Sequence, residues 1–292
     1  MNITEFITAQ LDEWPETRQR FDALAGCLTR TLDTPVRPIT VQHNPARAVS
    51  TGAAVDKGAI ARRPCFLCRA NRPTEQRALP FGDYEILVNP YPIFPEHLTI
   101  ACTAHTPQRI AGRFADMLRL TDALPGHTIF YNGPRCGASA PDHLHFQAAP
   151  TRCFPIIGAL REAAPAAAEG RISLYDLLPA CFAIDDPTPE ILSGLPDRLP
   201  ADVETGLPMV NILAWHDEEG RHAIVIPRRR HRPACYGNGA GCRLISPASV
   251  DLAGVFVAPR AEDFRNITAD ETAGIISEVT YPVSQLANII TH

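Results

Sequence analysis

The sequence predicts an α+β fold built on a largely antiparallel sheet. Strand-like apolar runs form two hairpins, at 84–101 and 127–148, and a helical pattern at 106–124 lies between them. The order hairpin, helix, hairpin is typical of α+β domains whose neighbouring strands pair antiparallel. The 292 residues are 45% hydrophobic and 20% charged, which is enough apolar material for one large domain or two small ones.

The limits of these central elements follow from their turn residues. The first hairpin consists of strands at 84–89 and 97–101 joined by a Pro-rich turn. Thr106 followed by Pro107 is a helix start, and apolar residues three and four apart give a buried stripe to about residue 124. The second hairpin consists of strands at 127–131 and 143–148, with a Gly-rich connection between them.

Further elements are predicted toward both ends of the chain. Apolar spacing predicts two helical segments within 4–30, whereas 43–80 is rich in Pro, Gly, Arg and Cys and is interpreted as loop. A strand is predicted near 181–184 and another at 252–258. The residues 268–271 fit a capping box and therefore open a helix.

The late part of the chain repeats an earlier pattern. A third hairpin is predicted at 209–226, and aligning 98–107 with 224–233 matches a strand, a histidine and a proline without a gap. This match supports a duplicated unit. We therefore divide the chain into an N-terminal unit at 1–155, a connector at 156–205 and a C-terminal half-unit at 206–292.

Charge and composition restrict the possible ligands and compartment. A formal net charge of -5 gives no overall attraction to nucleic acid or to an anionic membrane, so a small ligand and a local basic cluster are expected. The N-terminus resembles no secretory signal, and no apolar stretch approaches the roughly 20 residues of a membrane span. Nine scattered cysteines indicate reduced thiols rather than a disulfide framework. We expect a soluble, cytoplasmic protein, and a homodimer is left open.

The segment His143-Leu-His145-Phe-Gln147 carries the main candidate chemistry. On a strand, residues two apart point to the same face, so these three polar side chains form one row. The alternative is a solvent-facing row without a ligand. The Gly-rich connection directly before it favours a ligand, because such turns can direct backbone N–H groups at an anion.

These residues also carry a resemblance to a known family. The pattern resembles the active-site segment of the histidine-triad (HIT-like) superfamily, and it comprises Asn132-Gly133-Pro-x-x-Gly137-Ala138-Ser139, then Pro141, then His143-x-His145-x-Gln147. A glutamine in place of the third histidine looks like the branch of galactose-1-phosphate uridylyltransferase, dinucleoside-polyphosphate phosphorylase and GDP-L-galactose phosphorylase. The whole chain is similar to a group of bacterial proteins of that branch that is abundant in gut Bacteroidetes. The resemblance implies a duplicated HIT-like fold.

The resemblance also implies roles for individual residues. His145 would attack a nucleotide α-phosphorus to give a nucleotidyl-histidine, and Gln147 would hydrogen-bond the phosphoryl oxygens. Asn89 in the first hairpin is a candidate sugar contact. The loop residues of the motif would bind the substrate, and they are Asn132, Gly133, Gly137, Ala138 and Ser139. Asp142 adds one residue between Ser139 and His143 relative to the family pattern, which puts the assignment of Ser139 in doubt.

A second constellation has the composition of a metal site. Cys65 and Cys68 form a CxxC pair, and with His105 and His143 they would make a tetrahedral zinc set. In the uridylyltransferase branch a zinc is held by residues at corresponding places, which implies a structural zinc here. The alternatives are unmetallated thiols or a redox pair, and the second lacks a thioredoxin-like context.

A run of basic residues after the third hairpin is the strongest local positive charge in the sequence. It contains Arg228, Arg229, Arg230, His231 and Arg232. Guanidinium groups match phosphate geometry, so we expect some of these residues to hold a phosphate of the donor or acceptor. The alternative is a solvated surface run. His97 and His222 are interpreted as ordinary strand histidines.

Taken together, the sequence predicts a zinc-bearing nucleotidyl transferase or phosphorylase. Its donor would be a nucleoside diphosphate sugar or a dinucleoside polyphosphate, and its acceptor phosphate or a sugar phosphate. A hydrolase of the same superfamily is an alternative that Gln147 disfavours. A non-catalytic nucleotide sensor is a second alternative, and it would bind nucleotide without labelling His145.

Overall fold

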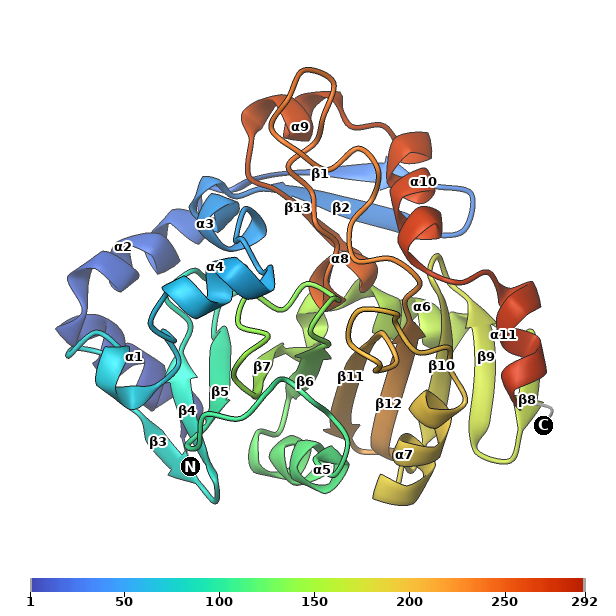
Figure 1. Cartoon of the computed structure of the whole chain (residues 1–292), viewed down its shortest axis with the longest axis horizontal. Coiled ribbons are helices and arrows are strands. Elements are labelled where there is room, and N and C mark those ends of the chain that lie inside the picture. The colour runs from blue at the N-terminus through green and yellow to red at the C-terminus, as the bar shows by residue number, and fades with distance from the viewer. Residues whose placement is uncertain (1, 291–292) are drawn as a thin grey trace.

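A ten-stranded antiparallel sheet forms the centre of the computed structural model, which describes residues 2–290 (Figure 1). Its strands in spatial order are β3 (Leu79–Phe81), β4 (Tyr84–Val88), β5 (Leu98–Cys102), β7 (His145–Pro150), β6 (His127–Asn132), β11 (Val210–Asp217), β12 (Gly220–Pro227), β10 (Ala180–Asp185), β9 (Ile172–Asp176) and β8 (Ala167–Glu169). A separate three-stranded sheet has the order β1 (Leu28–Asp33), β2 (Pro38–His43) and β13 (Val255–Ala258).

The helices lie around these two sheets. They are α1 (Ile3–Glu13), α2 (Pro15–Leu24), α3 (Ala48–Thr51), α4 (Lys57–Arg62), α5 (Phe114–Ala123), α6 (Pro155–Glu162), α7 (Pro189–Asp197), α8 (Ser249–Leu252), α9 (Ala261–Asn266), α10 (Ala269–Val279) and α11 (Val283–Ile290). Short 3-10 turns occur at Pro45–Arg47, Arg69–Asn71 and Thr151–Cys153. Among the described residues, none of the helices is long and apolar enough to cross a membrane.

The strand order divides the large sheet into two sets of five. In the first set the meander β3-β4-β5 is followed by α5 and then by the hairpin β6-β7. In the second set the meander β8-β9-β10 is followed by α7 and then by the hairpin β11-β12. The two sets join where β6 pairs antiparallel with β11. The predicted α+β fold with duplicated antiparallel units is therefore confirmed.

The duplication differs in extent from the one predicted by the sequence match. The alignment of 98–107 with 224–233 pairs β5 with β12, but by strand order β5 corresponds to β10 and β12 to β7. That alignment was wrong, because a strand followed by a histidine and a proline is a pattern that unrelated hairpins also share. The division at 155 and 205 stays a prediction, and the strand order favours a second repeat that begins with β8.

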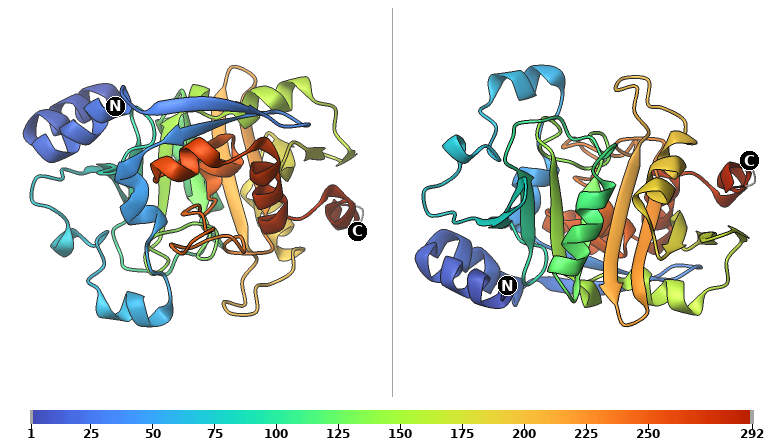
Figure 2. Two further views of the ribbon diagram at one scale, coloured as in Figure 1. Left: turned by 90° about the horizontal axis from the view of Figure 1, so that it is seen from above. Right: turned by 90° about the horizontal axis from the view of Figure 1, so that it is seen from below.

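Each face of the large sheet carries its own hydrophobic core. On one face, side chains such as Ile100, Phe146 and Phe182 pack against α1, α5, α7 and α11. On the other, side chains such as Phe130 and Ile224 pack beneath α6, α8, α10 and the three-stranded sheet. Figure 2 shows α5 and α7 on one side of the sheet and β1, β2 and α10 on the other. Alternation along each strand therefore fills both faces.

Most predicted elements are present, but several differ in their limits from the prediction. The strand predicted at 252–258 begins at Val255, because α8 occupies the residues before it, and the segment 43–80, interpreted as loop, contains α3 and α4. The helix after the first hairpin begins at Phe114 rather than at Thr106, because the segment before it turns at Gly112, whose φ is +73°, and packs against β7. The last strand of the second hairpin begins at His145 rather than at residue 143. The predicted helices at both ends are confirmed, including the capping box between Thr268 and Glu271.

Candidate active site

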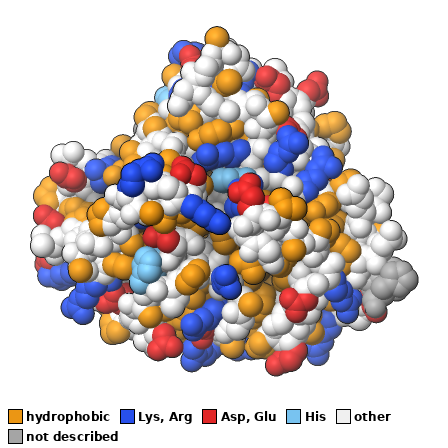
Figure 3. Space-filling model, in the orientation of Figure 1, with side chains coloured by type: hydrophobic (Ala, Val, Ile, Leu, Met, Phe, Trp, Pro, Cys, Tyr) orange, Lys and Arg blue, Asp and Glu red, His pale blue; other side chains and the backbone are white. Residues whose placement is uncertain are grey.

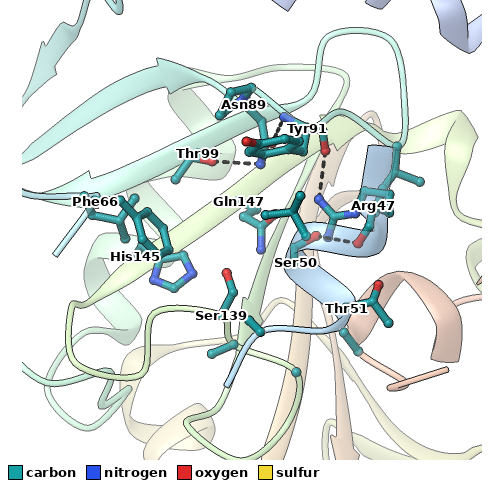
Figure 4. Close-up of a pocket in the computed structure, with 18 of the residues that line it drawn as sticks. Arg47, Ser50, Thr51, Phe66, Asn89, Tyr91, Thr99, Ser139, His145 and Gln147 are labelled. Carbon is teal, nitrogen blue, oxygen red and sulfur yellow. Dashed lines mark hydrogen bonds between the residues drawn. The ribbon is translucent and has the colours of Figure 1, made fainter. Parts of the chain in front are cut away.

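His145 and Gln147 share one face of β7 and line a cavity of about 970 Å³. The floor of this cavity is the sheet of the first repeat, and its walls come from the loops 45–73, 90–93 and 137–139 and from α8 (Figure 4). A volume near the upper end of the range for small-molecule sites can accept a ligand as large as a dinucleotide. His143 precedes the strand and points into a different cluster, so the predicted row of three is a row of two.

The imidazole of His145 is held in one tautomer by the backbone. Its Nδ1 lies 2.8 Å from the carbonyl oxygen of His143, which can only accept, so Nδ1 carries the hydrogen and Nε2 keeps its lone pair. Burial lowers the pKa of His145 to about 4, against the opposing effect of that hydrogen bond. The ring is therefore neutral near pH 7, as a nitrogen nucleophile must be.

The side chain of Gln108 fixes the backbone of His145. Its Oε1 accepts from the His145 N–H at 2.8 Å, and its Nε2 donates to the carbonyl oxygens of His145 and Asn132, each at 2.9 Å. These contacts occur where β6 and β7 separate, so the amide takes the place of a missing strand partner. Gln108 is fully buried, and it sets the position of the candidate nucleophile although it does not line the cavity.

The orientation of the Gln147 amide is determined by His97. The backbone N–H of Ile93 donates to His97 Nδ1 at 3.1 Å, so the hydrogen of this buried ring must reside on Nε2. Burial also lowers the pKa of His97 to about 3, which keeps the ring neutral. Nε2 lies 3.0 Å from Gln147 Oε1 and donates to it. The Gln147 amide must then present its NH₂ group to the cavity, as a donor to an anion.

The connection between β6 and β7 offers further donors. The N–H groups of Gly137, Ala138 and Ser139 make no hydrogen bond to any other residue in the described range 2–290, and all three residues line the cavity. Gly137 has a φ of +95°, and a Cβ there would lie 2.4 Å from the Cβ of Ala248. Only glycine fits this position, and the resulting loop leaves amide hydrogens available to an anion.

Asn132 is oriented by a buried polar network. Its Oδ1 accepts from the Ser249 N–H at 2.9 Å and from Asn211 Nδ2 at 2.7 Å. Arg228 Nη1 in turn donates to Asn211 Oδ1 at 2.8 Å. A backbone N–H can only donate, so the Asn132 atom that faces Ser249 must be the amide oxygen. The NH₂ of Asn132 is left as a donor toward the cavity that this residue lines.

The four predicted metal ligands come together at one edge of the cavity. The ligand atoms of Cys65, Cys68, His105 and His143 all lie within 4.8 Å of one another. Cys65 Sγ is 3.3 Å from His143 Nδ1, and Cys68 Sγ is 3.2 Å from His105 Nδ1. A tetrahedral zinc site with Zn–S of about 2.3 Å and Zn–N of about 2.0 Å has ligand–ligand edges of roughly 3.3–3.8 Å. The cluster can therefore hold a metal ion.

The surroundings of the cluster favour metal binding. His143 Nε2 donates to the Cys102 carbonyl at 2.7 Å, so Nδ1 is free to coordinate, in the arrangement usual for a ligating histidine. Burial raises the pKa of the Cys65 thiol, but the hydrogen bond to His143 and two backbone amides hold it lower, at about 6. A thiolate is the form that binds a metal.

The additional residue Asp142 has a structural partner. Asp142 Oδ1 accepts from Arg63 Nη2 at 2.6 Å, and Arg63 precedes the CxxC pair. The same guanidinium reaches the Ser139 carbonyl at 3.5 Å. This ion pair ties the metal-binding loop to the 137–139 loop, and Ser139 lines the cavity at their junction.

The predicted substrate-binding residues divide into two groups. Those that line the cavity are Asn89, Asn132, Gly137, Ala138, Ser139 and His231. Gly133, Arg228, Arg229 and Arg230 are not among its lining residues. Arg228 is buried and donates to carbonyls of Val279 and Pro247, Arg229 donates to carbonyls of α10, and Arg230 pairs with Glu278. The expectation that these three arginines hold phosphate is not supported, because their donors serve the protein itself.

Arg232, the last arginine of the predicted basic run, does line the cavity. Arg47 also lines it and was not predicted. Figure 3 shows basic side chains across the middle of the face in view. His97 lies just before β5, and its role could have been suspected only from the strand register, which pairs Thr99 with Gln147. Gln108 lies in the segment before α5 that the sequence predicted to be helical, and no signal in the sequence marks its side chain as functional.

The chain has an α+β fold in which His145 and Gln147 share one face of β7. Residues 6–150 match a family model described as a domain of unknown function, DUF4922. The fold is similar to that of yeast Ap4A phosphorylase Apa2, with 18% identity and a TM-score of 0.61 over 92% of this chain and 97% of that chain. The same enzyme in complex with AMP aligns at 17% identity and a TM-score of 0.58 over 93% and 98%. No curated protein matches the sequence.

Proposed function

We propose that this protein is a nucleotidyl transferase of the phosphorylase type that acts through a nucleotidyl-histidine on His145. The observation that carries the proposal is the neutral imidazole at the cavity wall, whose Nδ1 donates a hydrogen bond to a carbonyl and whose Nε2 has no partner within residues 2–290. The fold it shares with an Ap4A phosphorylase that has been crystallised with Ap4A and with AMP supports a nucleotide as the donor.

The proposed reaction has two displacements at the α-phosphorus. His145 Nε2 attacks phosphorus, an N–P bond forms, and the bond to the bridging oxygen breaks as the remaining phosphate chain leaves. Because that leaving group is itself a phosphate, it can depart as an anion without a proton from the protein. An oxygen of inorganic phosphate or a sugar phosphate then attacks phosphorus, the N–P bond breaks, and the neutral imidazole is restored.

The surrounding donors suit the charge that develops in each displacement. The NH₂ groups of Gln147 and Asn132 and the free amides of the 137–139 loop would bind the non-bridging oxygens. The hydrogen bond from His145 Nδ1 to the His143 carbonyl stabilises the ring while it carries positive charge as the nucleotidyl adduct. Phe66, whose surface is 45% exposed, stands beside His145 in Figure 4 and offers an aromatic face to a base.

Labelling with radioactive donors tests this function. Incubation with nucleoside diphosphate sugars and dinucleoside polyphosphates is expected to give acid-labile, base-stable label on the wild-type chain and none on His145→Ala. Release of the label as a nucleoside diphosphate on addition of phosphate identifies a phosphorylase, whereas release as a monophosphate by water alone identifies a hydrolase. If the protein binds nucleotides but no donor labels it, the proposal is wrong and a nucleotide sensor is favoured.

We also infer that the Cys65, Cys68, His105 and His143 cluster binds zinc in a structural role. With four protein ligands the site has no open position for substrate. The metal would fix the CxxC loop against the turn that precedes β7, and hence the backbone from which His145 extends. This arrangement supports a role in positioning rather than in chemistry.

Zinc content is expected to fall when a ligand is removed. Wild-type protein should carry about one zinc per chain by elemental analysis, and Cys68→Ser should lose most of it, because a tetrahedral thiolate site loses affinity steeply with one ligand replaced. Cys153→Ser, a half-buried cysteine outside the cluster, is the matched control and should keep its zinc. Stoichiometric zinc in Cys68→Ser would contradict the assignment.

A further inference from the structure

Arg47 carries a cationic group at the cavity wall that makes no direct ion pair within residues 2–290. Its Nη1 donates to the Tyr91 carbonyl at 2.8 Å, and its buried Nε has no partner. No carboxylate of the described chain, residues 2–290, comes within 4.0 Å of its guanidinium. Burial lowers the pKa of Arg47 to about 10, so the group is still charged near pH 7. A half-buried cation without a direct ion pair is costly, and an anionic ligand would offset that cost.

The nearest acid does not neutralise Arg47. Asp251 also lines the cavity, but its two oxygens accept the backbone N–H groups of Ala248 and Val257, each at 2.9 Å. Burial raises the pKa of Asp251 to about 6, and Arg47 is only one of the smaller effects that oppose this. Both carboxylate oxygens are thus occupied by hydrogen bonds from the backbone at α8 and β13. The free donors of Arg47 remain available to a ligand.

The position of Arg47 relative to the candidate catalytic residues is fixed by a single turn. Three consecutive carbonyls of this turn accept from one segment: Tyr91 from Arg47, Pro92 from Asn44 at 3.0 Å and Ile93 from Gln42 at 3.1 Å. The N–H of Ile93 donates to His97, which orients Gln147. The same turn therefore holds Arg47 directly and Gln147 through His97.

Figure 4 shows Gln147 between His145 on one side and Arg47 with Ser50 and Thr51 on the other. A phosphorus atom over His145 would have its oxygens near Gln147, and the next group of the substrate would extend toward Arg47. Two hydroxyl side chains and a guanidinium are suitable partners for a second phosphate. Of the basic run after β12 that the sequence favoured for this role, Arg228, Arg229 and Arg230 do not line the cavity. Arg232 does, but its Nε and Nη2 donate to Ser246 Oγ and to the Ala53 carbonyl.

We propose that Arg47 forms a subsite for the phosphate that follows the α-phosphate, so that the ligand is a chain of at least two phosphates. The assignment of the α-phosphate to His145 rests on the proposed function. The anion subsite itself does not require catalysis. Its ligand class is the linear oligophosphate, in contrast to a nucleoside monophosphate or a carboxylate.

Calorimetric titration with inorganic anions tests the subsite without any assumption about the base. Wild-type protein is expected to bind pyrophosphate at least about tenfold more tightly than orthophosphate. Arg47→Gln should weaken pyrophosphate binding about ten- to a hundredfold, the range for one charge-assisted hydrogen bond, and change orthophosphate binding less than threefold. Arg47→Lys keeps the charge and should retain most of the preference. Arg20→Gln is the matched control, because Arg20 also lines the cavity but already has Glu16 at 3.6 Å.

Three results would contradict the proposed subsite. Equal binding of the two anions by the wild type, an unchanged affinity in Arg47→Gln, or a Lys variant as weak as the Gln variant would each do so. Thermal unfolding of every variant shows whether a loss of binding reflects a loss of fold. Because no turnover is measured, the subsite can stand if His145 is never labelled, and it can fail while labelling succeeds.

Discussion

Gln147→Ala is expected to slow the labelling of His145 about a hundredfold or more in a single-turnover experiment. The reason is that its NH₂ group, held toward the cavity by His97, is placed to bind the charge that develops on the phosphoryl oxygens, and removal of one such donor costs a rate factor of about 10²–10³. His97→Leu should slow the same step about tenfold. Without the His97 donor, the amide can present either its oxygen or its nitrogen to the anion.

A double-mutant cycle separates positioning from a general structural effect. If His97 acts through Gln147, adding His97→Leu to Gln147→Ala should slow labelling by less than twofold further. Independent, multiplying losses would instead assign His97 a structural role, and the orientation argument would fail. The matched control is Thr99→Val. Thr99 pairs with Gln147 across the strands, but its hydroxyl accepts from Asn89 Nδ2 at 2.9 Å, so it should couple weakly to Gln147.

The metal cluster and the catalytic row were predictable because their residues obey short spacing rules. A CxxC pair, and residues two apart on a strand, are patterns that can be recognised without tertiary structure. The prediction failed for His143 in one respect. The strand begins at His145, so His143 turns toward the thiols while His145 and Gln147 face the cavity. The His143–Gln147 motif therefore contributes to two sites, the metal cluster and the cavity. In a continuous strand all three polar side chains would have faced the same site.

The residues that orient the site could not be predicted from pattern. Gln108 and His97 act through single side-chain hydrogen bonds to groups far away in the sequence, and such bonds leave no periodicity. Arg228 shows the opposite error. A run of arginines after a strand resembles an anion site, yet the first of them is buried and is satisfied by five protein acceptors, which only the packing of α10 and the 246–249 segment makes possible.

The fold class was predictable, but the extent of the repeat was not. Strands and helices follow from local apolar spacing, which the second repeat retains. Its meander, however, lies in a segment rich in Ala and Pro, where β8 and β9 have weak strand patterns. β9 is stabilised by pairing with β10, β8 is stabilised by pairing with β9, and both strands contact α11. Long-range pairing of this kind determines where the second unit begins, and it is not encoded locally.

Acid is expected to destabilise the protein partly through His145, and the size of this effect tests the neutral-nucleophile argument directly. Burial depresses the pKa of His145 to about 4, below the value of about 6.5 for an unfolded histidine. The unfolded state therefore binds more protons between these two values. Stability from this group is present above about pH 6.5 and is lost as the pH falls toward 4. Between pH 7 and pH 5 its share of the loss is about 2 kcal/mol.

Urea unfolding at pH 7 and pH 5 gives the free energy of unfolding lost between the two pH values. This loss should be about 2 kcal/mol smaller in His145→Ala than in the wild type. Gln147→Ala removes a neighbouring side chain that does not titrate, so its loss should equal that of the wild type. Protonation of the metal ligands and of Asp251 contributes in all three proteins and cancels in the differences. An unchanged loss in His145→Ala would mean that the ring titrates as it does in water. Its imidazole would then be exposed to water. The argument that burial keeps the nucleophile neutral would be wrong.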